Sequence, residues 1–141
     1  MSRLLGNVLV IFAVSANAAT AQVISEPADS VQIKLRGALR ALASAQEKHY
    51  TAHGTYSDDV ETLKTYPGCE IAAGVTVAIQ HASPLGWAAE STHNALPGES
   101  CVYWIARPNT IGPLVTRRQK YPGHEFPGRA ICDFDPLPSV R

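Results

Sequence analysis

The clearest pattern in the chain is an apolar stripe at helical spacing between residues 30 and 54. At about 100° per residue, apolar side chains three and four positions apart share one face of a helix. The positions in the stripe are Val31, Leu35, Ala38, Leu39, Leu42, Ala45 and Tyr50. Ser30 is a suitable N-cap, and Gly54 can adopt the left-handed conformation that ends a helix. The stripe therefore predicts one amphipathic helix, which needs an apolar partner surface.

Period-two patterns take over after this helix. Residues 75–80 alternate and are rich in β-branched side chains, as in a strand, and residues 86–93 would form a hairpin with them. Residues 101–106 predict a third strand, and residues 130–134 a return to the sheet edge. The prolines of residues 107–129 exclude a central strand there. We expect an α+β domain, in which a long N-terminal spine helix packs on a three- to four-stranded antiparallel sheet.

Several polar residues near the end of the predicted helix allow further predictions. Ser57 is suited to cap a short helix over residues 58–64, and the acids in its first turn suit the positive end of that helix. These acids, Asp58, Asp59 and Glu61, are not part of a recognisable calcium loop, so we expect no metal there. Gln46 lies near the centre of the stripe, where an unpaired amide is costly, so its side chain should bond to the backbone of the sheet or an adjoining loop.

The N-terminus has the pattern of a secretory signal peptide. Arg3 is followed by a short apolar run and then by small residues with A-x-A spacing, which predicts cleavage after Ala18 or Ala21. The alternative is a retained anchor, because residues 4–21 match the shortest membrane-spanning helices in length. We divide the chain into a signal peptide (1–21), a linker (22–29), a globular domain (30–135) and a tail (136–141). The mature product should be soluble and periplasmic or secreted, with no transmembrane segment.

Charge and cysteine content limit the functional classes. The 141 residues include 12 Lys and Arg side chains against 12 Asp and Glu, so no overall field attracts nucleic acid or an anionic membrane. The three cysteines are Cys69, Cys101 and Cys132. In an oxidising compartment they predict one disulfide and one remaining thiol, and their number and spacing do not choose the pairing. We expect the unpaired cysteine to be a small buried residue.

One segment is locally basic, the loop of residues 107–129. Its charged and aromatic side chains are Arg107, Arg117, Arg118, Lys120, Tyr121, His124, Glu125, Phe126 and Arg129. Several cations with interleaved aromatic rings favour contact with anionic groups or with an acidic protein partner. From this set we take Arg107, Arg117, Arg118, Lys120, Tyr121 and Arg129 as candidate binding residues. The alternative is an ordinary solvated loop, because no nucleic-acid-binding module is recognisable.

Catalytic and metal-binding patterns are weak. His49 and His53 share a helix face at the spacing of a zinc pair, but they lie near the end of the apolar stripe and no Glu follows His49. No serine or cysteine has a recognisable nucleophile signature. We expect neither enzymatic activity, nor a metal, nor a cofactor.

The order of these motifs resembles the globular head of type IV pilins and of the pseudopilins of type II secretion systems. The matching segments are AQEKHY (45–50), GTYS (54–57), GVTVAI (74–79), GWAAESTH (86–93), the strand of Cys101 and the late Cys132. The likeness extends over residues 31–134. Pilins of this class begin with a short basic leader and a long apolar helix half, and neither is recognisable in this sequence. The resemblance therefore implies a pilin-like head that is exported without the filament-forming segment.

The resemblance also implies a disulfide and a role. A bridge between Cys101 and Cys132 would close the C-terminal loop, while pairing of Cys69 with either of them stays open. The implied function is structural or lies in protein interaction, as an accessory to a pilus or secretion assembly. The alternative function is a binding module that captures an anionic polymer or surface through the basic loop.

Overall fold

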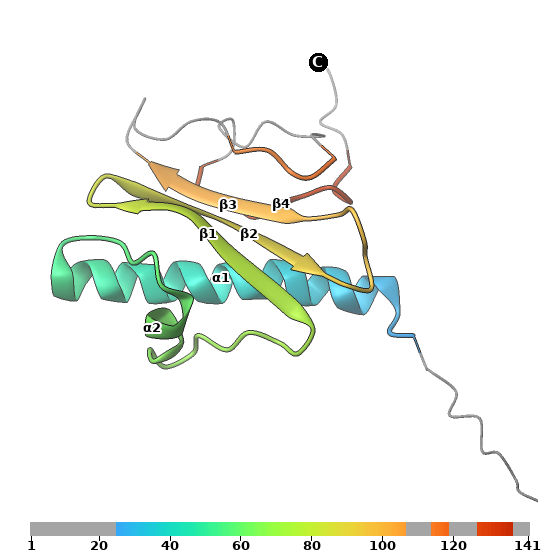
Figure 1. The fold of residues 1–141 in the computed structure, drawn as a ribbon, viewed down its shortest axis with the longest axis horizontal. Coiled ribbons are helices and arrows are strands. Elements are labelled where there is room, and N and C mark those ends of the chain that lie inside the picture. Colours follow the sequence, from blue (N-terminus) through green and yellow to red (C-terminus); the bar gives the residue numbers. More distant parts are fainter. Residues whose placement is uncertain (1–24, 107–113, 119–126, 137–141) are drawn as a thin grey trace, which may run out of the picture.

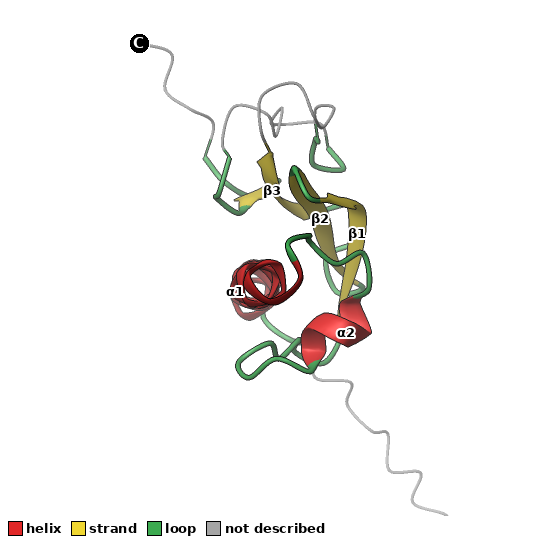
Figure 2. Cartoon of the chain, turned by 90° about the vertical axis from the view of Figure 1, so that its left-hand side faces the viewer, coloured by secondary structure: helices red, strands yellow, loops and turns green. Residues whose placement is uncertain are grey.

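The computed structural model describes residues 25–106, 114–118 and 127–136, and it is an α+β domain. One helix, α1, lies along one face of a four-stranded antiparallel sheet with strand order β1-β2-β3-β4 (Figure 1). Figure 2 shows α1 end-on beside this face, with the short helix α2 next to it. The elements are α1 (Ala28–His53), α2 (Val60–Lys64), β1 (Val75–Ser83), β2 (Gly86–His93), β3 (Cys101–Ala106) and β4 (Ile131–Cys132). The predicted class and the packing of a helix on an antiparallel sheet are confirmed.

Several sequence predictions lie outside this description. The signal peptide (1–21) and the first three residues of the linker (22–29) fall within residues 1–24, and the tail (136–141) is described only at Pro136. Within the described ranges, no helix is both long enough and apolar enough to cross a lipid bilayer.

Helix α1 begins earlier than predicted and ends as predicted. Pro27, with φ −57°, occupies the N-cap position without a side-chain cap, so the prediction of Ser30 as N-cap is wrong. The Ser30 hydroxyl instead donates to Glu26 Oε1 at 2.7 Å. Gly54 has φ 71°, and its N–H donates to the carbonyl of Tyr50 at 2.7 Å. The left-handed glycine therefore ends the helix as the sequence indicated.

The apolar stripe of α1 forms the core with the sheet. Six of the seven predicted stripe residues are buried, and the seventh, Tyr50, is half-buried beside Tyr56. The sheet contributes Trp87 and Tyr103, whose rings stack with centroids 5.0 Å apart, and both are buried. Burial of these large apolar side chains is the main contribution that holds helix and sheet together.

Gln46 connects the helix to the following loop. Its Nε2 donates to the carbonyl of Ser57 at 2.7 Å, and its Oε1 accepts from the Ser57 N–H at 2.8 Å. Both polar groups of the buried amide are satisfied by backbone, as predicted. α2 starts later than predicted, at Val60, and the Ser57 hydroxyl accepts from the N–H of Asp59 at 3.1 Å. Asp59 is its N-cap and accepts from the N–H groups of Glu61 and Thr62, so the prediction of Ser57 as the cap is wrong.

The strands match the predicted segments, with two changes of length. β1 continues to Ser83, past an irregularity between Ile79 and His81, because it pairs with β2 up to the turn. The predicted strand 130–134 is reduced to β4, which pairs with the start of β3. Cys101 lies directly opposite Cys132 in this pairing, and the two form a disulfide. This pairing is confirmed, and Cys69 is free and buried.

Candidate functional site

The predicted basic loop is described only in part. Arg107, Lys120 and Tyr121 lie outside the described residues, as do His124, Glu125 and Phe126. Arg117, Arg118 and Arg129 are described, and all three are exposed. The structure places them in two different surroundings.

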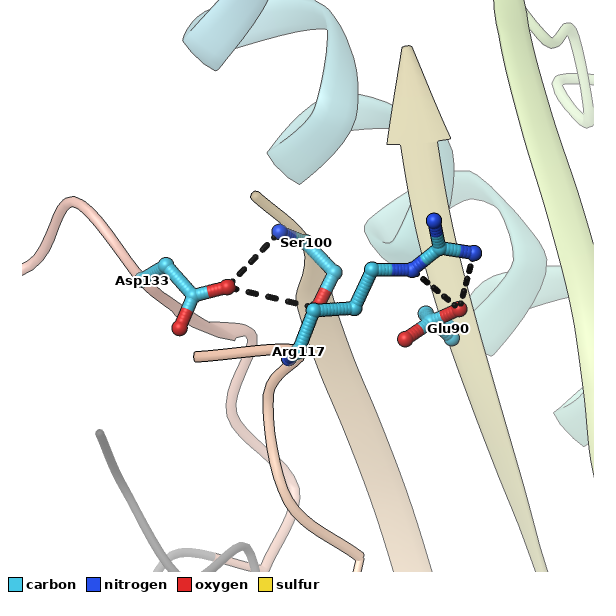
Figure 3. Close-up of polar contacts among 4 residues, drawn as sticks. All are labelled: Glu90, Ser100, Arg117 and Asp133. Carbon is cyan, nitrogen blue, oxygen red and sulfur yellow. Dashed lines mark hydrogen bonds and ion pairs between the residues drawn. The ribbon is translucent and has the colours of Figure 1, made fainter. Parts of the chain in front are cut away.

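Arg117 and Arg118 each pair with an acid that lies outside the loop. Arg117 Nη2 is 3.2 Å from Glu90 Oε1 on β2, and its Nε donates to the same oxygen at 3.3 Å (Figure 3). Arg118 Nη2 is 2.9 Å from Glu99 Oε1, in the turn before β3. Glu90 and Glu99 lie outside the loop, in the sheet and its turn, so they were not among the acids considered when the loop was predicted to be basic. Much of the charge of these two predicted site residues is therefore compensated within the chain.

A buried carboxylate, Asp133, holds the backbone of these two arginines, directly at Arg118 and through Ser100 at Arg117. Figure 3 shows its side chain directed at Ser100, whose N–H donates to Asp133 Oδ2 at 2.8 Å. Asp133 Oδ1 accepts from the N–H of Arg118 at 3.2 Å, and Ser100 Oγ accepts from the N–H of Arg117 at 2.8 Å. Ser100 and Asp133 are both buried. Ser100 and Asp133 therefore hold the backbone of Arg117 and Arg118 in place. The Ser100 hydroxyl is buried, so a substrate could not reach it.

Arg129 belongs to a different surface, a groove between α1 and the C-terminal segment, residues 127–136. A hollow of about 530 Å³ lies here, and its charged lining residues are Arg36, Arg40, Arg129 and Asp135. Three arginines therefore face one aspartate. Two come from successive turns of α1, and the third comes from the segment that the disulfide fixes to β3.

Arg36 connects the two sides of this groove. Its Nη1 donates to the carbonyl of Ala130 at 3.0 Å, and its Nη2 forms an ion pair with Asp135. The guanidinium also lies over the ring of Phe134, 5.4 Å from its centroid. Both terminal nitrogens of the Arg36 guanidinium therefore bond within the chain, where they hold the C-terminal segment against the helix.

Arg40 and Arg129 are the cations of the groove that have no acid partner among the described residues. Both are exposed, and within the described residues neither forms an ion pair or a hydrogen bond. Sequence reasoning missed Arg36 and Arg40 as site residues, because they lie on the polar face of a predicted helix. The available signal was their spacing of four residues, which places both on one side of the helix.

The other sequence candidates have contacts within the chain. The rings of His49 and His53 stack with centroids 4.2 Å apart, and His49 Nδ1 lies 3.1 Å from the Tyr66 hydroxyl. Burial, and then the neighbouring His53, lower the pKa of His49. In the part of the chain that the structure describes, no three His, Cys, Asp or Glu side chains form a group that could hold a metal ion.

Cys69 has the surroundings of a buried thiol. It is part of the main core, and burial raises the pKa of its thiol. A raised pKa lowers the fraction of the reactive thiolate at neutral pH. Cys69 is therefore protected from oxidation and from disulfide exchange in the folded protein.

The comparisons with known proteins assign no family. No protein-family model matches the chain, and no curated protein matches its sequence.

Proposed function

We propose that this protein is an exported, non-enzymatic domain of pilin-like type that acts by binding other proteins, as an accessory to a pilus or secretion assembly. The fold supports this proposal through a helix packed on an antiparallel sheet, with a C-terminal segment closed onto β3 by a disulfide. A disulfide persists in oxidising compartments, which supports a location outside the cytoplasm.

The observation that carries the proposal is the uncovered face of α1. Ile33 lies on this face with 72% of its surface exposed, the largest value among the exposed large apolar residues of the described chain. Next to it are the groove and the C-terminal segment that Arg36 holds in place. A shaped surface that combines apolar and charged groups is typical of protein interaction sites.

The test uses the protein in its native host. A photo-crosslinking amino acid is introduced at Ile33 and, as the matched control, at Thr76, which is exposed on β1. We expect the Ile33 variant, recovered from the exported fraction, to crosslink to a subunit of a pilus or secretion assembly, and the Thr76 variant not to. Retention of the protein in the cytoplasm, or a crosslinking pattern that is the same at both positions, would contradict the proposal.

A second candidate function is capture of an anionic polymer through the basic loop, and it is favoured by Arg129, which is exposed and has no ion pair within the described residues. It predicts retention on heparin that falls with salt. Because Arg117 and Arg118 are paired with acids, Arg129→Ala should reduce this retention more than the two substitutions Arg117→Ala and Arg118→Ala together. Absence of salt-sensitive retention would exclude this function.

A further inference from the structure

The groove beside α1 has a charged end and an apolar end. A second hollow, of about 450 Å³, adjoins the one that Arg129 lines, and the two share Arg36, Arg40 and Asp135. The second hollow is lined in addition by Ile33, Gly37 and Phe134. The two hollows therefore adjoin along the helix and are described as one groove, in which Arg129 lines only the first hollow, Ile33, Gly37 and Phe134 line only the second, and Arg40 lines both.

Gly37 lies in the middle of α1, in the floor of this groove. Glycine destabilises a helix interior relative to alanine. A Cβ atom at Gly37 would meet nothing within 4 Å, so packing within the described chain does not require a glycine here. Ile33, Gly37 and Arg40 follow one another at spacings of four and three residues, which puts them on one face of the helix. A glycine there lets the backbone of another molecule come close to the helix.

The distribution of charge favours a peptide over a uniformly anionic chain. Arg40 and Asp135 line both hollows, and Asp135 is paired with Arg36. Arg129 lines only the first hollow and has no acid partner among the described residues, whereas Asp29 lines only the second. A polymer with an anionic group on every unit would place charge beside Asp29. A segment with a carboxylate at one end and an apolar side chain at the other would complement both ends.

We propose that this groove binds a peptide segment of a partner protein in which an acidic side chain lies close to an apolar one. The carboxylate accepts hydrogen bonds from the guanidinium groups of Arg40 and Arg129, which can hold it in bidentate fashion. The apolar side chain packs on Ile33 and Phe134, and the peptide backbone passes over Gly37. This inference rests on the proposed role in protein interaction, and it names the surface and the chemistry of the partner.

The experiment measures binding of labelled peptides to the mature full-length protein by fluorescence anisotropy. The probe is a synthetic peptide in which Glu and Leu alternate with Ser, and the comparison peptides carry Gln in place of Glu, or Ser in place of Leu. Heparin is the anionic-polymer probe. We expect the Glu-Leu peptide to bind, added salt to weaken the binding, and both comparison peptides to bind at least about tenfold more weakly.

Matched variants locate the binding site. Arg40→Glu with Arg129→Glu should weaken binding of the Glu-Leu peptide at least about tenfold, because two attractive charges become repulsive. Gly37→Leu should weaken it similarly, and because its Cβ enters open space the thermal unfolding temperature should not fall. The controls are Arg117→Ala with Arg118→Ala, and Ala52→Leu in the exposed last turn of the same helix; neither should change binding.

Three outcomes would overturn the inference. These are no binding of the Glu-Leu peptide, binding that Arg40→Glu with Arg129→Glu leaves unchanged, and binding of heparin in preference to the peptide. Each of them concerns the groove alone. Export and crosslinking at Ile33 are measured separately, so failure of the groove and failure of the proposed function can be told apart.

Discussion

Two pairs of arginines in this protein have different surroundings, although all four are exposed. Arg117 and Arg118 are paired with Glu90 and Glu99, which come from the sheet and its turn. Arg40 and Arg129 converge on one groove, and neither has an acid partner among the described residues. An exposed cation is available to a ligand only when the fold provides no acid for it. The first pair therefore has acid partners within the chain, and the second pair has none among the residues that the structure describes.

Both pairs depend on the C-terminal segment that carries Asp133 and Arg129. The disulfide holds this segment on β3, and Asp133 holds the backbone of Arg118. Changes to this segment should affect stability more than changes to any single arginine. The predictions below test this ranking.

The largest effect is expected from removing the disulfide. Cys101→Ala together with Cys132→Ala should lower the free energy of unfolding by about 3–4 kcal/mol, the value that the loop-entropy model gives for a bridge with a sequence separation of 31. Urea unfolding followed by circular dichroism measures this difference. The control Cys69→Ala keeps the bridge and should cost less. An equal loss in both variants would show that core packing, and not the bridge, limits stability.

The second effect concerns the carboxylate of Asp133. Asp133→Asn should lower the free energy of unfolding by about 2 kcal/mol, because an amide directed at buried N–H donors leaves at least one of them without an acceptor. The same unfolding measurement applies, with Asp58→Asn, at an exposed position, as the control. If the two variants were equally stable, Asp133 would not be what holds the Arg117–Arg118 turn.

The third effect tests whether the groove face of α1 is free. Gly37→Ala should raise the free energy of unfolding by about 0.5–1 kcal/mol, because alanine favours a helix interior and its methyl group enters open space here. Thermal unfolding measures the change. Destabilisation by this methyl group would mean that another part of the chain already covers the groove beside Arg40.

The smallest effect separates the two arginine pairs directly. Arg117→Ala should cost about 0.2–1 kcal/mol, and less at high salt, because the ion pair with Glu90 is partly exposed. Arg129→Ala should leave the free energy of unfolding unchanged at either salt concentration. The free energies of unfolding of both variants are measured from unfolding curves at low and at high salt. Equal, salt-dependent losses in the two variants would remove the distinction between the pairs.

The local elements could be predicted because their signals are local. The period of the apolar residues identified α1 and β1, hairpin position and β-branched and aromatic content identified β2 and β3, and Gly54 marked the end of the helix. The predicted capping residues of both helices were wrong, because the predicted serines bond elsewhere. The Ser30 hydroxyl bonds to Glu26 and the Ser57 hydroxyl accepts from the N–H of Asp59, while Pro27 and Asp59 occupy the cap positions.

By itself, the sequence determined the α+β class, the buried face of the helix and the approximate strands, since each of these follows from spacing along the chain. Only the tertiary structure decided which cations are free. Glu90 lies 27 residues from Arg117 in sequence, and Arg40 shares a groove with Arg129, which lies in a distant segment. Ion pairing depends on distance in space, and a count of charges along one loop contains no information about that distance.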